Sequence, residues 1–223
     1  MRERTLLVIA GPSAGGKTTV MDALCVMDAR FVPVRSVTTR APRGDAFDSE
    51  YTYADREGFL TLVEDKMLLE WAEYGGDLYG TPRADVDAIL SRGEIPTLVL
   101  NLDGVRSLSA TEYDPCAVYV FCDPNVAEQR LYNRYVGDAP TVDGLARFVK
   151  RRERNLSDYT VLPDMTDKFF ATLMNEGTPE ESAAALRELV AEFVAGGEKK
   201  RAQVENDFSA LRDFALAKSG NRE

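Results

Sequence analysis

The chain has 223 residues, which is enough for one large domain or for a core that carries small inserted subdomains. Hydrophobic residues make up 44% of the chain and charged residues 29%, so it can bury a sizeable core. The net charge of −10 argues against a nucleic-acid polymer as partner, because proteins that bind one usually present a basic face. The absence of histidine excludes Ser-His-Asp and Cys-His hydrolases and any histidine-ligated metal site.

The first apolar run, residues 5–10, ends at a glycine and a proline. It is too short for a signal peptide or a membrane span, and no later run reaches spanning length. Cys25, Cys116 and Cys122 are odd in number and lack the spacing of metal ligands. We therefore expect a cytoplasmic protein with reduced thiols and no membrane partner.

Alternating strand and helix patterns predict the core. Thr5 to Ala10 is a continuous apolar run of the kind found in strands buried on both faces, and a helix over Thr18 to Met27 follows a glycine-rich turn. Further buried strands are predicted at Ile95 to Leu102, Ala117 to Cys122 and Phe169 to Met174. Because helical stretches separate these strands, the pattern predicts an α/β fold with a parallel sheet flanked by helices.

Other segments depart from this pattern. Residues 36–82 are rich in Tyr, Arg, Gly and acidic residues, and short alternating pieces predict an inserted mixed α+β subdomain there. Residues 124–157 form a strongly charged helical segment, and a helix that starts after Thr178 closes the core and ends at Gly196. The tail beyond Glu198 predicts one more helix, which we expect to pack on the core or to fray. Its apolar residues fall on one face: Val204, Phe208, Leu211 and Ala215.

Residues 11–18 match the phosphate-binding pattern G-x-x-x-x-G-K-[ST] at every fixed position. Glycines let successive backbone N–H groups converge on a phosphate, and the following helix adds its positive N-terminal end. Lys17 would neutralise the β- and γ-phosphates, and the Thr18 hydroxyl would ligate Mg²⁺. GTPase switches, motor ATPases and small-molecule kinases share such a loop. The predicted ATP-binding residues here are Gly11, Pro12, Ser13, Ala14, Gly15, Gly16, Lys17, Thr18 and Thr19.

Motifs in the inserted segment narrow the choice. Residues 36–43 read Ser-Val-Thr-Thr-Arg-Ala-Pro-Arg, residues 70–73 read Glu-Trp-Ala-Glu, and residues 79–82 read Tyr-Gly-Thr-Pro. The combination of S-x-T-T-R-x-P-R with Y-G-T-P some forty residues later resembles the nucleotide-binding subdomain of guanylate kinases. Together with the phosphate loop, the resemblance covers residues 5–190.

The acceptor phosphate needs cations and hydroxyl groups. Arg40 and Arg43 are three residues apart in a loop, so their guanidinium groups can fork onto one phosphate. Tyr51 and Tyr79 can each add a hydroxyl donor. The resemblance implies that these four residues hold the phosphate of GMP.

The acceptor base is read by polar groups. Guanine presents N1–H and a 2-amino group as donors, which suits a carboxylate, whereas adenine has an acceptor at N1. The resemblance implies that Glu70 reads these two donors. It also implies that Ser36, Thr81 and Asp103 contact the base.

Phosphoryl transfer depends mainly on positioning and charge stabilisation, so it needs no histidine. Arg130 and Arg134 form an i,i+4 pair, and Arg147 follows a turn-rich segment. The resemblance implies that a closing lid brings these arginines down, with Arg130 on ATP, and that it excludes water. The predicted catalytic residues are Lys17, Arg40, Arg134 and Arg147.

The resemblance implies an enzyme that phosphorylates GMP and dGMP with ATP and Mg²⁺. Its partners would be the small molecules ATP and GMP, and the sequence leaves open whether it is a monomer or a homodimer. The implied division is a core with the phosphate loop at 1–35, a GMP-binding subdomain at 36–90, core at 91–123, a lid at 124–157, core at 158–197 and a C-terminal helical tail at 198–223.

Two alternatives remain open at this point. A kinase of the same fold could act on another phosphorylated acceptor, such as a modified nucleotide or a sugar phosphate, although Glu70 with Ser36 argues against it. Guanylate-kinase-like domains also serve as non-catalytic binding modules, but Lys17 and Thr18 argue for a working phosphate loop. One departure concerns a family strand that ends D-x-D before a spacer and a glycine. Here residues 101–104 read Asn-Leu-Asp-Gly, so the first acid is an amide that brings no charge to Mg²⁺.

Overall fold

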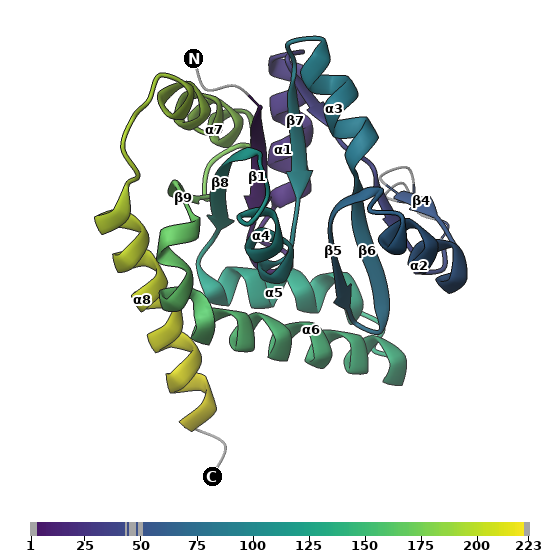
Figure 1. Ribbon diagram of the computed structural model, residues 1–223. Coiled ribbons are helices and arrows are strands. Elements are labelled where there is room, and N and C mark those ends of the chain that lie inside the picture. The colour runs from purple at the N-terminus through teal and green to yellow at the C-terminus, as the bar shows by residue number, and fades with distance from the viewer. Residues whose placement is uncertain (1–3, 43, 45–47, 49–50, 221–223) are drawn as a thin grey trace.

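The computed structural model describes residues 4–42, 44, 48 and 51–220. Its core is a five-stranded sheet in the order β2-β7-β1-β8-β9, and every neighbouring pair of strands is parallel. This confirms the predicted α/β fold with a parallel sheet (Figure 1). The strands are β1 Thr5–Ala10, β2 Phe31–Pro33, β7 Ile95–Val99, β8 Asp114–Phe121 and β9 Ala171–Met174.

Helices cover both faces of this sheet, which is why β1 at its centre is apolar throughout. Leu7 and Ile9 pack with α1 (Lys17–Met27) and α7 (Pro179–Val194). Leu6 and Val8 face the opposite layer. That layer is formed by α3 (Arg83–Ser91), α4 (Leu102–Leu108), the end of α6 (Val142–Val161) and α8 (Arg201–Gly220). Within the described residues, no helix is long and apolar enough to cross a membrane.

A second, four-stranded sheet lies to one side of the main sheet (Figure 1). Its order is β4-β3-β6-β5, with β3 and β4 parallel and the other pairs antiparallel. Phe59 of the covering helix α2 (Arg56–Glu64) is fully buried and anchors a small separate core. The strands are β3 Ser36–Thr38, β4 Tyr51–Tyr53, β5 Leu68–Tyr74 and β6 Asp77–Pro82.

Two long helices, α5 (Pro124–Tyr135) and α6, run side by side below the main sheet (Figure 1). The ring centroids of Tyr132 and Phe148 lie 5.5 Å apart in an edge-to-face contact between these helices. The first half of α6 projects Val142 into solvent, whereas Asn155 and Tyr159 near its end are buried. A 3-10 helix, η2 (Leu162–Lys168), follows directly.

Some element boundaries differ from the prediction. The strand predicted over Ile95 to Leu102 ends at Val99, because Asn101 is the N-cap of α4. The Oδ1 atom of Asn101 accepts a hydrogen bond from the N–H of Gly104 at 2.7 Å. The three-residue edge strand β2 was not predicted, since so short a segment carries no periodicity.

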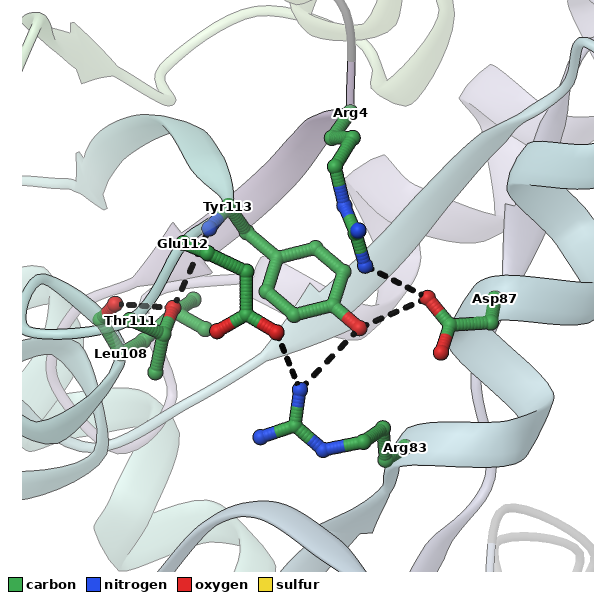
Figure 2. Close-up of polar contacts among 7 residues, drawn as sticks. All are labelled: Arg4, Arg83, Asp87, Leu108, Thr111, Glu112 and Tyr113. Atoms are coloured by element: carbon green, nitrogen blue, oxygen red, sulfur yellow. Dashed lines mark hydrogen bonds and ion pairs between the residues drawn. The ribbon is translucent and has the colours of Figure 1, made fainter.

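A polar cluster fastens α3 to the segment before β8 (Figure 2). The Tyr113 ring is buried between two guanidinium groups, with the carbon of Arg4 at 4.3 Å from the ring centroid and that of Arg83 at 5.7 Å. The Tyr113 hydroxyl donates to Asp87 at 2.7 Å, and Arg83 donates to Glu112 at 2.6 Å. Because Arg83 directly follows β6, the cluster fixes the point at which the chain leaves the second sheet.

The C-terminal segment forms α8 and packs on the core, which is one of the two outcomes expected for it. Phe208 is fully buried between Tyr119 of β8 and Phe169, at centroid distances of 5.2 and 5.3 Å. The far end of α8 is held by Lys218, whose ammonium group lies 3.6 Å from the carboxylate of Glu128 in α5. The helix is therefore a structural part of the domain.

Replacing Phe208 with alanine should lower the free energy of unfolding by about 3–5 kcal/mol, because it leaves a cavity beneath two aromatic rings. Urea denaturation followed by far-UV circular dichroism measures this change. Leu216→Ala is the matched control, since Leu216 lies on the same helix with 55% of its surface exposed. Its effect should stay within about 0.5 kcal/mol. Equal losses in the two variants would contradict the packing of α8.

Candidate functional site

The phosphate loop joins β1 to α1 through backbone conformations that favour glycine. Gly11 and Gly16 have φ angles of 151° and 88°. A Cβ atom on Gly11 would lie 1.9 Å from the carbonyl oxygen of Val120, and one on Gly16 would lie 2.1 Å from Nδ2 of Asn175. Glycine is therefore required at both fixed positions of the sequence pattern, because the φ angles are positive and a Cβ atom would clash.

Two asparagines from distant parts of the chain hold the loop. Asn155 of α6 accepts from the N–H of Ser13 at 2.8 Å and donates to the Ser13 carbonyl at 3.1 Å. Asn175, which follows β9, donates to the Gly15 carbonyl at 3.0 Å and accepts from Ser182 of α7 at 2.8 Å. These bonds fix the loop backbone in the protein without any ligand.

The Lys17 side chain is partly buried, and its ammonium group donates to the carbonyls of Gly11 and Pro12 at 2.9 and 2.8 Å. The pKa of Lys17 is lowered to about 8, mainly by burial and then by the charge of Arg151, while the carboxylate of Asp158 opposes the decrease. A polyanion beside Lys17 would favour the charged ammonium. The electrostatics of the loop therefore suit a phosphate ligand.

A cavity of about 330 Å³ lies in front of the loop and extends to the second sheet. Its wall combines the phosphate loop, the carboxyl end of β7, strands of the second sheet, and α5 and α6. Most predicted site residues line it, although they come from distant segments. These are Gly11, Ser13, Ala14, Gly16, Lys17, Thr18, Thr19, Ser36, Arg40, Tyr51, Glu70, Tyr79 and Arg134.

Glu70 is the buried carboxylate on the far side of the cavity. Thr81 of the neighbouring strand is also buried, and its hydroxyl donates to Oε1 of Glu70 at 2.6 Å. Burial raises the pKa of Glu70 to about 7, although the hydrogen bonds from Thr81 work against the increase. A ligand with N–H donors would stabilise the ionised form, so the site favours such a ligand.

Arg40 is the buried cation of the second sheet. Its guanidinium group donates to Oδ1 of Asp48 at 3.1 Å and to the Tyr53 hydroxyl at 3.2 Å. The guanidinium carbon also lies 5.0 Å from the centroid of the Tyr51 ring, where it makes a cation–π contact. These contacts position Arg40 at the cavity wall. The predicted phosphate-binding residue Arg43 lies outside the described residues.

Asp103 and Arg147 are predicted site residues that do not line the cavity and contact neither the phosphate loop nor Glu70 in any recorded hydrogen bond or ion pair. Asp103 is half exposed on α4, and its carboxylate pairs with Arg106 at 3.1 Å and with Arg154 at 3.7 Å. It points away because β7 ends early and residue 103 already belongs to the helix. Arg147 leaves 64% of its side chain exposed and pairs with Asp143 on its own helix at 2.8 Å.

The other predicted residues support the cavity from behind. The Gly15 N–H donates to the Pro12 carbonyl at 3.1 Å, which closes the turn of the loop. Arg130 of α5 donates to the Ala14 carbonyl at 3.5 Å and to the sulfur of Cys122 at 3.6 Å. Arg130 therefore contacts the loop from outside.

Sequence reasoning missed several residues that line the cavity or hold the loop. Arg151 lies one turn after Arg147. It lines the cavity, where Arg147 was expected. Asp158 of α6 and Tyr119 of β8 also line the cavity, and Asn155 holds the loop. The available signal was the helical spacing of residues 151, 155 and 158, which places them on one face of α6.

Within the described residues, no three Cys, Asp or Glu side chains are grouped so that they could hold a metal ion. A divalent cation in this cavity would need phosphate oxygens for most of its ligands. Magnesium is commonly held in that way, through one or two protein groups, several waters and substrate phosphates. The Thr18 hydroxyl lines the cavity at the start of α1 and fits this role.

Comparison with known proteins places these features in a family. The family model described as guanylate kinase matches residues 3–190. A guanylate kinase of Rubrobacter xylanophilus is 31% identical over 199 residues, which cover 89% of this chain and 99% of that protein. A guanylate kinase of Trichodesmium erythraeum is 36% identical over 137 residues, which cover 60% of this chain and 73% of that protein.

A solved structure of a guanylate kinase has a similar fold to this chain. The crystal structure of guanylate kinase from Anaplasma phagocytophilum superposes with a TM-score of 0.56 at 23% identity, covering 86% of this chain and 88% of that one. At this identity the likeness concerns the fold. Helix α8 lies beyond the residues that the family model matches.

Glu70→Gln should raise the free energy of unfolding at pH 8 by about 1–3 kcal/mol, because it removes the cost of burying an ionised carboxylate. The folded pKa of about 7 lies above the ordinary value, so ionisation destabilises the fold as the pH rises between the two values. The gain should therefore shrink toward pH 5. Urea denaturation at pH 5 and pH 8 measures it, with the exposed residue Glu64→Gln as the control. A gain independent of pH would contradict the burial of Glu70.

Proposed function

The chain belongs to the guanylate kinase family, and from this premise we propose how its residues phosphorylate GMP with ATP. The protein is an ATP:GMP phosphotransferase, and ATP and GMP are its nucleotide substrates. One observation carries the residue assignment: Glu70, bonded to Thr81, lines the same cavity as Lys17. The carboxylate that we propose to read guanine and the phosphate loop thus face one cavity.

In the proposed complex, GMP binds against the second sheet. The Glu70 carboxylate accepts hydrogen bonds from N1–H and the 2-amino group of guanine, and Thr81 orients that carboxylate. Ser36 lies beside the base. Arg40 and Tyr79 bind the GMP phosphate together with two further predicted partners, Tyr51 and Arg43.

ATP binds at the other end of the cavity, with its phosphates in the phosphate loop. An oxygen of the GMP phosphate attacks the γ-phosphorus of ATP, the bond from that phosphorus to the β–γ bridging oxygen breaks, and GDP and ADP form. Lys17, Arg134 and Arg151 line the cavity at this end and offset the charge that spreads over the transferred group. We propose α5 and α6 as the lid and the second sheet with α2 as the GMP-binding subdomain.

Mg²⁺ is the proposed cofactor, with the Thr18 hydroxyl as its protein ligand. When bound, it neutralises oxygens of the β- and γ-phosphates. We also propose a cytoplasmic location, since that compartment supplies both nucleotides and keeps thiols reduced. In agreement with this, Cys25, Cys116 and Cys122 are free.

Coupled ADP-release assays with GMP, dGMP, AMP, CMP, UMP and dTMP should show turnover with the guanine nucleotides. Glu70→Gln should lower kcat/KM for GMP by about 10- to 100-fold, because it replaces a charged acceptor with an amide that presents a donor to guanine. Lys17→Ala should abolish turnover with every acceptor. If GMP gave no turnover while another acceptor did, the assignment of Glu70 would be wrong.

The apparent affinity for GMP should depend on pH through Glu70. Because its pKa in the free enzyme is about 7 and guanine binds the ionised form, kcat/KM for GMP should rise between pH 6 and 7 and level off above pH 8. The GMP phosphate also titrates in this range. The pH profile of kcat/KM for Glu70→Gln, which lacks the carboxylate, therefore serves as the baseline. A wild-type profile parallel to that baseline would contradict the role of Glu70.

A further inference from the structure

The carboxyl end of β7 presents no acid to the nucleotide site in the described part of the chain. Val99 and Asn101 line the cavity there, whereas Asp103 does not line it and pairs with Arg106. The Oδ1 atom of Asn101 is already used to cap α4. The strand beside the phosphate loop therefore offers no carboxylate to a metal-bound nucleotide.

Only two carboxylates line the cavity within the described residues, and they lie on different elements. Glu70 belongs to the second sheet, where Thr81 holds it. Asp158 belongs to α6, three residues after Asn155, so the two side chains share one face of the helix. Because Asn155 grips Ser13, that face lies against the phosphate loop, and the charge of Asp158 acts on Lys17.

A buried hydroxyl lies in the same part of the cavity. The hydroxyl oxygen of Tyr119 is inaccessible to solvent and has no hydrogen-bond partner in the described part of the chain. The ring is fixed by edge-to-face contacts with Phe169 at 5.6 Å and Phe208 at 5.2 Å, so the hydroxyl cannot readily turn elsewhere. A buried hydroxyl without a partner costs about 1–3 kcal/mol, which implies a partner that is absent from the protein itself.

We propose that Asp158 and Tyr119 bind the water shell of the magnesium ion that accompanies ATP. Asp158 provides the carboxylate that β7 lacks, and it reaches the ion from α6 across the phosphate loop. The Tyr119 hydroxyl bonds to a water of the same shell. Both groups fit magnesium, which keeps several waters and is held through few protein carboxylates. The inference rests on the proposed function, because it assumes that the phosphate loop binds ATP. It involves none of the residues proposed to bind GMP.

Arg154 keeps Asp158 in place for this role. Its Nε lies 2.9 Å from Asp158 and its Nη2 lies 3.7 Å from Asp103. One carboxylate oxygen of Asp158 is therefore held by Arg154.

Calorimetric titration of ADP, with and without Mg²⁺, tests the proposal without GMP or turnover. In wild-type protein Mg²⁺ should tighten ADP binding. In Asp158→Asn that metal-dependent gain should fall by about 5- to 10-fold, while binding of metal-free ADP stays equal or becomes tighter because a negative charge near the phosphates is gone. Tyr119→Phe should lose about 2- to 3-fold of the gain.

Mn²⁺ provides a second readout, because the EPR signal of free Mn²⁺ reports how much binds to the protein with ADP. Asp164→Asn is the control, since it makes the same charge change at an exposed residue of η2. If Asp158→Asn proves unstable in thermal melts, Asp158→Glu is measured as well. Because it keeps the charge, Asp158→Glu should retain most of the Mg²⁺-dependent gain in ADP affinity. Equal weakening of ADP binding with and without metal would overturn the proposal and leave Asp158 a structural partner of Arg154. The ADP titrations contain no GMP. They can therefore be interpreted even if the assay with GMP fails.

Discussion

The hold of two asparagines on the phosphate loop is the constraint on which the rest of the site depends. A loop with positive φ angles at Gly11 and Gly16 would be costly to order at the moment of binding. Asn155 and Asn175 hydrogen-bond to the loop, so it is ordered when the protein folds and not when a ligand binds. Since α6 also carries Arg151 and Asp158, one helix fixes both the loop and the charges around it. The distances among these groups are therefore set before a nucleotide arrives, as electrostatic catalysis requires.

The second organising feature is a concentration of positive charge in an acidic protein. The chain has a net charge of −10, yet four cations face one cavity. Burial is the main cause of the lowered pKa of Lys17, and the charges of Arg151 and Arg134 add to it. Nucleotide phosphates supply the missing negative charge, so ligand binding should stabilise the fold as well as prepare the reaction. The cations are Lys17, Arg40, Arg134 and Arg151.

Local sequence was sufficient to predict the core strand, the phosphate loop and the fold class, because each depends on neighbouring residues. The presence of Glu70 and Arg40 in one cavity was predictable from the motifs, whereas their roles stay predictions. The choice between Arg147 and Arg151 was not predictable, since the rotation of α6 about its axis is set by contacts with the loop and with α8. Likewise, a strand boundary three residues earlier than expected turned Asp103 from a predicted base contact into a helix residue outside the cavity.

The position of Phe208 has a consequence for how the protein is made. The last helix of the chain covers Tyr119 and Phe169, which belong to the middle of the fold. During synthesis, when β9 leaves the ribosome, α8 is still inside the exit tunnel, and the part of the main sheet that α8 covers is still exposed. Domains usually fold as units once their sequence is available. This part of the fold is therefore completed only once α8 has been synthesised, and a nascent chain stalled before α8 would expose the aromatic face to chaperones.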